Sequence, residues 1–274
     1  MAISATTLTY IRRLAQQEAG ITIEEGKEYL IENRLLPLAQ NHGYSSIDDY
    51  ISYLQSQPVN GAHHKLINAL TINETSFFRD IHPFDSLREY LIPELMKKRE
   101  LGKTIRIWSA ACSTGQEPYS IAMLLKENFP SLVSQWSVSI LGTDINDEVL
   151  EKAKAGVYTQ LEVNRGLPIK LLIKYFNKLP DQKWQVKDDL KKLVLFRQQN
   201  LFAPMPTINS YDIIFLRNVL IYFSTETKQK ILKQIRSVLA DDGYLFLGAS
   251  ESTCFYDDTF EPRTVGKSTV YVKK

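Results

Sequence analysis

Strand-like and helix-like segments alternate along the chain from Thr104 onwards, and this alternation constrains the fold more than any other feature. Apolar runs typical of buried strands occupy five stretches, at 105–110, 137–143, 193–196, 211–216 and 244–248. Strands separated by helices form parallel sheets with crossover helices. The sequence therefore predicts an α/β fold with an open, mostly parallel sheet, completed by an antiparallel hairpin over 264–272.

Residues typical of helix starts and helix ends mark the predicted crossover helices. Pro118 suits the first turn of a helix that continues through 121–125. Asn146 is a predicted N-cap, and Gly156 follows the last turn of the same helix. A strongly periodic helix is predicted over 225–240.

The helical periodicity of residues 1–72 predicts an N-terminal all-helical domain. Leu8, Ile11 and Leu14 fall on one helical face, and Ser46–Asp49 resembles a capping box that begins a later helix. Residues 73–103 are predicted to form a linker followed by a helix that runs from Pro83 to Lys98. Residues 104–274 then form the α/β domain.

A basic insertion interrupts the α/β pattern over 157–193. The stretch is too long for a crossover loop, and it contains a short helical pattern at 171–176 and a strand-like stretch at Trp184. Residues 151–197 carry 11 Lys and Arg against 5 Asp and Glu, a net charge of +6, whereas residues 1–90 carry 7 against 11. Such a segment is either a solvated face or a surface for an acidic partner.

Composition excludes several classes of protein. The 274 residues are 44% hydrophobic and 23% charged, which is typical of a globular protein. No apolar run approaches the roughly 20 residues of a membrane span, and Met1–Tyr10 lacks the pattern of a signal peptide, so a cytoplasmic protein is expected. Two cysteines and four scattered histidines predict no metal site.

Polar residues at predicted strand ends indicate a ligand site. The loop that follows the first strand is rich in small residues, but Gly115 is its only glycine, so a dinucleotide fingerprint is absent. Glu117 either stabilises the helix dipole or contacts a ligand. Asp144 ends the second strand, and because Asn146 already supplies a cap, Asp144 is predicted to accept the hydroxyls of a ribose.

Two further motifs contribute candidates. Asn73, Thr75 and Arg79 alternate with aromatic residues and predict the lining of a cleft between domains. Arg217 and Asn218 follow another strand and are expected near the same cleft.

Four motifs together are similar to the chemotaxis receptor methyltransferase family. They are Asn-x-Thr-x-Phe-Phe-Arg at 73–79, Trp-Ser-Ala-Ala-x-Ser-Thr-Gly-x-Glu-Pro-Tyr-Ser at 108–120, Thr-Asp-Ile-Asn at 143–146 and Arg-Asn-Val-Leu-Ile-Tyr-Phe at 217–223. The resemblance covers nearly the whole chain. It implies a Rossmann-like S-adenosylmethionine-dependent methyltransferase fold, with an N-terminal helical domain, a helix at 73–103 bordering the cofactor cleft, and a small inserted β-subdomain at 157–193.

The resemblance also implies an activity. Enzymes of this family transfer a methyl group from S-adenosylmethionine to glutamate side chains of methyl-accepting chemotaxis receptors, giving methyl esters and S-adenosylhomocysteine without a metal. The implied cofactor contacts are Asn73, Thr75, Arg79, Glu117, Asp144, Asn200, Leu201, Arg217 and Asn218. Arg79 and Tyr222 are the implied catalytic residues that orient the incoming carboxylate, with a cofactor-only role for Arg79 as the alternative.

Two segments through which members of this family bind their receptors differ here from the family pattern. The second N-terminal helix has only Lys27 and Arg34 as basic residues, although in the family it is often strongly basic. The segment between Phe176 and Trp184 is short and lacks glycine, so capture of a receptor's C-terminal pentapeptide is not expected. The expected partner is the cytoplasmic helical domain of a receptor, and the enzyme is expected to be a monomer without membrane insertion.

Three other functions fit the sequence less well. A nucleic-acid methyltransferase would need an Asn/Asp-Pro-Pro-aromatic motif or a Pro-Cys nucleophile, but Val219 and Leu220 follow Asn218. A nicotinamide oxidoreductase would need the missing glycine fingerprint. A silent receptor adaptor would not need intact cofactor motifs.

Overall fold

The computed structural model describes residues 3–205 and 210–274, which form two compact units. One unit comprises the chain up to Ile72 together with Tyr222–Thr227, and the other comprises Asn73–Ile221 together with Lys228–Lys274.

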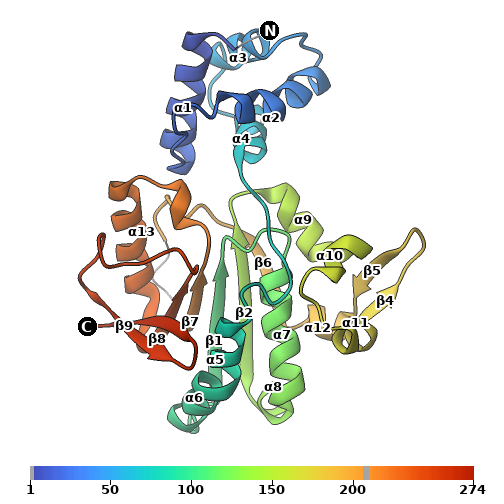
Figure 1. Ribbon diagram of the computed structural model, residues 1–274, viewed down its shortest axis with the longest axis vertical. Coiled ribbons are helices and arrows are strands. Elements are labelled where there is room, and N and C mark those ends of the chain that lie inside the picture. Colours follow the sequence, from blue (N-terminus) through green and yellow to red (C-terminus); the bar gives the residue numbers. More distant parts are fainter. Residues whose placement is uncertain (1–2, 206–209) are drawn as a thin grey trace. The chain divides into compact units, whose positions relative to one another are not determined.

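The first unit is built from four helices (Figure 1): α1 (Ala5–Ala19), α2 (Glu28–Asn41), α3 (Ile47–Gln55) and α4 (Gly61–Leu70). The side chains of Ser4, Ser46 and Asn60 cap three of them by accepting backbone N–H groups. Their apolar faces meet in one core, which confirms the predicted all-helical domain; it includes Ile11, Leu14, Leu35, Ile51 and Leu66.

The second unit contains a seven-stranded sheet in the order β6-β2-β1-β7-β8-β10-β9 (Figure 1). The strands are β1 (Thr104–Ala110), β2 (Ser137–Asp144), β6 (Val194–Gln198), β7 (Tyr211–Leu216), β8 (Leu239–Leu247), β9 (Phe260–Val265) and β10 (Ser268–Lys273). The first five pair in parallel, and β10 pairs antiparallel with β8 and β9. The predicted parallel sheet with a C-terminal antiparallel hairpin is therefore confirmed.

One strand boundary differs from the prediction. Strand β8 begins at Leu239, whereas the sequence predicted a start at Tyr244, and α13 (Thr225–Val238) accordingly ends two residues early. Asp241 and Asp242 lie outside both predicted elements, but in the structure they belong to β8. The pairing of β8 with β7 shifts register at this point, since Leu239 faces Tyr211 and Tyr244 faces Ile213, while Asp242 pairs with Arg99 and Asp241 with Lys273.

Helices connect β1 to β2, β2 to β6 and β7 to β8, as the predicted crossovers require. The predicted helix from Pro83 to Lys98 is observed as one continuous helical stretch with a π-helical middle turn. The remaining helical bounds are α5 (His82–Ser86), η1 (Leu87–Leu91), α6 (Ile92–Lys98), α7 (Gln116–Asn128), α8 (Pro130–Gln135), α9 (Asp147–Ala155) and η2 (Leu220–Tyr222). Asn146 caps α9 and Gly156 ends it, as predicted.

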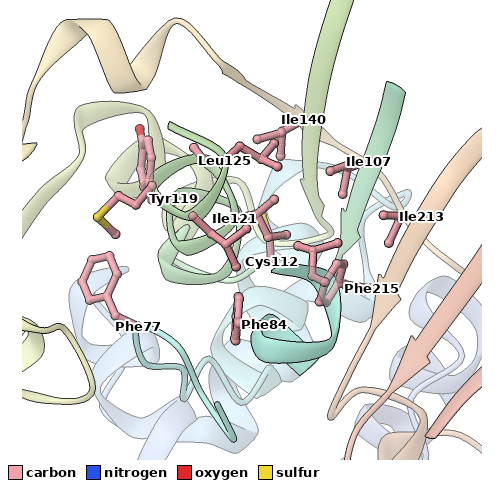
Figure 2. Close-up of a cluster of buried hydrophobic side chains, with 14 of the residues drawn as sticks. Phe77, Phe84, Ile107, Cys112, Tyr119, Ile121, Leu125, Ile140, Ile213 and Phe215 are labelled. Carbon is pink, nitrogen blue, oxygen red and sulfur yellow. The ribbon is translucent and has the colours of Figure 1, made fainter. Parts of the chain in front are cut away.

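The main core lies between α7 and one face of the sheet. The register aligns Ile140, Ile107 and Ile213 in one row across β2, β1 and β7. Figure 2 shows this row facing Ile121 and Leu125 of α7. All five side chains are buried, and this packing fixes the carboxyl ends of the central strands relative to α7.

The insertion forms a small antiparallel sheet in the order β3-β5-β4. Its elements are β3 (Val157–Thr159), α10 (Gln160–Asn164), α11 (Ile169–Tyr175), β4 (Phe176–Lys178), β5 (Lys183–Val186) and α12 (Asp188–Lys191). The predicted inserted β-subdomain is therefore confirmed.

Candidate functional site

The register of the sheet brings four chain segments together at one edge. Thr143, Ala110, Leu216 and Leu247 lie in one row across β2, β1, β7 and β8. The residues that follow them are Asp144, Ala111, Arg217 and Gly248, so these emerge side by side. Open parallel sheets bind ligands at this edge, where the strand order reverses, and here the reversal lies between β1 and β7.

The loop between β1 and α7 folds back onto the end of β2. The Cys112 N–H donates to the Thr143 carbonyl at 2.8 Å, and the Ser113 N–H donates to Asp144 Oδ2 at 2.8 Å. Ala111 and Ser113 adopt positive φ values of 56° and 51°. Non-glycine residues enter this region at a cost of about 1–2 kcal/mol each, so the loop stores strain beside the candidate site.

Asp144 is held rigidly at the tip of β2. Its Oδ1 accepts the Asn146 N–H at 3.0 Å, while Oδ2 accepts the Ser113 N–H, and the residue is only 6% exposed. Burial raises the pKa of the Asp144 carboxyl above its ordinary value, and the backbone N–H groups partly oppose this rise. A carboxylate offers roughly four acceptor positions, so two backbone bonds leave capacity for further donors.

Glu117 and Arg217 form a buried ion pair. Arg217 Nη1 donates to Glu117 Oε2 at 2.8 Å, and Ser109 Oγ donates to Glu117 Oε1 at 2.7 Å. Arg217 Nη2 also donates to Asp80 Oδ2 at 2.8 Å and to the Arg79 carbonyl at 2.9 Å. The Arg217 side chain is 2% exposed, so this network fixes its guanidinium and joins the motif at 73–79 to strands β1 and β7.

The Asn73–Arg79 motif is attached to the same sheet edge. The Asn73 carbonyl accepts Ser113 Oγ–H at 2.8 Å, and Ser120 Oγ accepts the Phe78 N–H at 3.0 Å. Arg79 is half-buried, and its Nη1 donates to the Glu74 carbonyl at 3.1 Å. The side chains of Asn73 and Thr75 are half-buried as well.

The insertion also packs against this motif. Phe77 is fully buried and meets Tyr158 edge to face, with ring centroids 5.1 Å apart, while Arg165 pairs with Glu74 at 2.7 Å. Gly166 has φ +84°, and a Cβ there would lie 2.0 Å from the Phe77 carbonyl oxygen. The close contact therefore requires glycine, and the insertion supports the site segment.

Asn200 and Leu201 follow β6 on the other side of Asp144. The Asp144 carbonyl accepts the Gln199 N–H at 2.9 Å, which joins the two segments. Asn200 Oδ1 accepts the Phe202 N–H at 2.9 Å, and Leu201 is 7% exposed. The structure thus brings Asn73, Thr75, Arg79, Glu117, Asp144, Asn200, Leu201, Arg217 and Asn218 into segments that meet at one sheet edge.

Tyr222 belongs to the unit of N-terminal helices. Its carbonyl accepts the Thr22 N–H at 2.9 Å, and the next residue, Phe223, forms a β-bridge with Ile21. The catalytic role of Tyr222 stays a prediction.

Sequence reasoning missed two members of the network, Ser109 and Asp80. Ser109 carried a signal, because a fully buried hydroxyl near the end of a central strand needs a partner. Asp80 follows Arg79 directly, but its pairing with Arg217 spans 137 residues of sequence. No local pattern predicts such a contact.

Within residues 3–205 and 210–274, no cluster of three or more His, Cys, Asp or Glu side chains is arranged to hold a metal ion. The helices in the same part of the chain are all too short or too polar to cross a membrane.

Comparison with known proteins gives a consistent result. Residues 73–268 match the family model described as the CheR methyltransferase SAM-binding domain, and residues 6–71 match the CheR methyltransferase all-alpha domain. The chain is 38% identical over 265 residues to the chemotaxis protein methyltransferase Cher2 of Pseudomonas putida, covering 96% of both chains. It is 42% identical over 269 residues to a chemotaxis protein methyltransferase of Vibrio parahaemolyticus, covering 96% of this chain and 94% of the relative.

Proposed function

This chain belongs to the CheR methyltransferase family, and we propose from that premise that it methylates glutamate side chains of chemotaxis receptors with S-adenosylmethionine. The observation that carries the proposal is the sheet edge, where a buried acid, Asp144, and the Glu117–Arg217 pair meet at the reversal of strand order. The products are glutamate methyl esters and S-adenosylhomocysteine.

The residues at the sheet edge fit the cofactor. Asp144 presents an anionic acceptor with free capacity, which suits the two hydroxyls of a ribose. Asn200 and Leu201 would flank the adenine, because their segment is bonded to the end of β2. Asn73, Thr75, Arg79, Glu117, Arg217 and Asn218 would complete the cofactor-binding set.

The reaction needs positioning more than proton transfer. S-adenosylmethionine supplies a methyl group on a positively charged sulfur, which leaves as a neutral thioether. A glutamate carboxylate has an ordinary pKa of about 4.3 and is already ionised at neutral pH, so no general base is required. The contribution of the protein is to hold a carboxylate oxygen in line with the methyl group and to exclude water.

Arg79 and Tyr222 are the proposed orienting residues for the acceptor carboxylate. Arg79 uses one nitrogen for the Glu74 carbonyl, and a guanidinium carries five N–H donors in a rigid fork. Tyr222 offers one phenolic donor. If Arg79 serves the cofactor alone, Tyr222 carries this role.

The proposed partner is the cytoplasmic helical domain of a receptor, and the enzyme is proposed to be cytoplasmic and monomeric. The β4–β5 hairpin consists of strands of three and four residues, which supports the inference that no C-terminal receptor pentapeptide is captured there. The basic insertion would instead attract the acidic receptor surface at longer range.

Two measurements test the proposal. Calorimetric titration with S-adenosylhomocysteine should show one site per chain. Incubation with labelled S-adenosylmethionine and membranes that contain candidate receptors should then label the receptors. Absence of binding would refute the cofactor assignment, and binding without receptor labelling would refute the acceptor assignment.

A further inference from the structure

The carboxylate of Glu251, in the loop after β8, accepts four backbone N–H groups. Oε2 accepts from Gly248 and Asn218, both at 2.7 Å, and Oε1 accepts from Val219 at 2.9 Å and from Leu220 at 2.7 Å. Three of these donors follow Arg217 consecutively. One side chain therefore holds the whole turn that leads out of β7.

These amides need such a partner. Asn218 and Val219 follow the end of β7, and Leu220 is the first residue of the 3₁₀ turn, so these three N–H groups lie beyond the strand and at the start of a helical turn, where backbone donors need another acceptor. Asn218 also has φ 56°, in the left-handed region, which asparagine enters more readily than most non-glycine residues but still at a cost that the held turn offsets. Successive amides converging on one anion form the kind of concave cradle that fixes a loop.

Gly248 is adapted to the same contact. A Cβ at this position would lie 2.7 Å from Glu251 Oε2 and 2.8 Å from both the backbone nitrogen and Nδ2 of Asn218. The absence of a side chain at Gly248 lets the carboxylate reach the turn. Gly248 and Glu251, both distant from Arg217 in the sequence, thus hold the same turn.

The clamped turn belongs to the edge of the sheet that carries the candidate site. Arg217 enters it with its guanidinium already fixed by Glu117 and Asp80. Arg217, Gly248 and Glu251 also line a cavity of about 270 Å³, together with Lys267. A shift of the turn would therefore move both Arg217 and Asn218 and change the wall of this cavity.

We propose that Glu251 is a positioning residue for the methyl transfer: its carboxylate fixes the Arg217–Leu220 backbone in the conformation that binds the cofactor. The inference rests on the proposed cofactor roles of Arg217 and Asn218. In this role Glu251 acts on cofactor binding through the turn that it holds.

The test compares Glu251→Gln with Glu251→Asp. Glutamine keeps the size of the side chain but replaces one acceptor oxygen with an NH₂ group that faces backbone donors, so affinity for S-adenosylhomocysteine should fall about tenfold or more. Aspartate keeps the charge on a shorter side chain and should bind with an affinity between glutamine and wild type. Glu261→Gln is the matched control, because the Glu261 side chain is 51% exposed on β9.

Kinetics and hydrogen exchange separate positioning from general stability. In Glu251→Gln, the KM for S-adenosylmethionine should rise about tenfold, whereas the KM for the receptor should stay within about twofold. The amides of Asn218, Val219 and Leu220 should exchange faster, while the Ile107 amide in β1 keeps its protection.

Gly248→Ala perturbs the same contact from the opposite side and should reproduce this pattern, with Gly102→Ala as its control because a Cβ at Gly102 meets nothing within 4 Å. Wild-type cofactor affinity in Glu251→Gln or in Gly248→Ala would overturn the proposal, as would unchanged exchange at residues 218–220. A wild-type protein that binds no S-adenosylhomocysteine would refute the proposed function instead, and the exchange measurement would still report on the clamp.

Discussion

Replacement of Asp144 by asparagine tests the proposed ribose contact with the least change in shape. In the wild-type protein, Oδ1 and Oδ2 each accept one backbone N–H, from Asn146 at 3.0 Å and from Ser113 at 2.8 Å. Asparagine keeps one acceptor oxygen and places an NH₂ group at the other position. The matched control is Asp147→Asn, because Asp147 is exposed in the first turn of α9.

The expected loss of affinity follows from the charge of the acceptor. A hydrogen bond to a charged group contributes about 1.5–3 kcal/mol, which corresponds to about 10- to 150-fold weaker binding of S-adenosylhomocysteine. In the fold, a backbone N–H that faces the new NH₂ group costs about 1–3 kcal/mol. Removal of a buried charge opposes this cost, so the free energy of unfolding should fall by less than about 3 kcal/mol.

The pH dependence has opposite signs for stability and for binding. Because burial raises the pKa of Asp144 in the folded state, the folded protein binds this proton more tightly than the unfolded chain does. The carboxyl therefore lowers stability at pH values above its folded pKa, and this penalty disappears as the pH falls through that value. Cofactor binding instead needs the ionised form, so affinity should decrease over the same range.

Calorimetric titrations from neutral to acidic pH, paired with denaturant unfolding, check both effects. Asp144→Asn should bind weakly and lose the part of the pH dependence that comes from this carboxyl, whereas Asp147→Asn should behave like the wild type. Unchanged affinity in a well-folded Asp144→Asn protein would remove Asp144 from the site.

Four further results are expected. Tyr222→Phe should lower turnover while S-adenosylhomocysteine affinity stays nearly constant, and equal turnover by the two proteins would refute the orienting role. Gly166→Ala should reduce the free energy of unfolding by at least about 2 kcal/mol, because its Cβ would meet the Phe77 carbonyl at a positive φ; denaturant titration against Gly102→Ala measures this, and equal stability would contradict it. Receptor pentapeptides should not bind, and receptor methylation should slow as salt screens the net charge of +6 on residues 151–197; micromolar peptide binding or salt-independent methylation would contradict these expectations.

The sheet and most of the site edge could be predicted because their signals are local. Apolar runs define the strands, and Asp144 and Arg217 directly follow predicted strand ends. Once the parallel order is known, the register brings these residues together without further information. The small residues after β1 indicated a loop that can approach a ligand closely, and in the structure Ala111 and Ser113 of this loop have positive φ values.

The contacts that stabilise the edge could not be predicted, because their partners are far apart in sequence. Asp80 meets Arg217 across 137 residues, and Glu251 reaches the amides of Asn218–Leu220 from 31 to 33 residues away. The start of β8 was predicted too late because the residues before Tyr244 form an irregular part of the strand, where its register with β7 shifts. Asn200 and Leu201 were found only through the family resemblance, because neither has a chemical signature of its own.

The position of the transferred methyl group tests the central claim most directly. A receptor cytoplasmic fragment incubated with this enzyme and isotopically labelled S-adenosylmethionine can be digested and mapped by mass spectrometry, before and after mild alkali. The label should lie on glutamate side chains and should be released by alkali as methanol, as expected for a carboxylate ester. Label that resists alkali, or that maps to lysine, to another nitrogen-bearing side chain or to nucleic acid, would contradict the account.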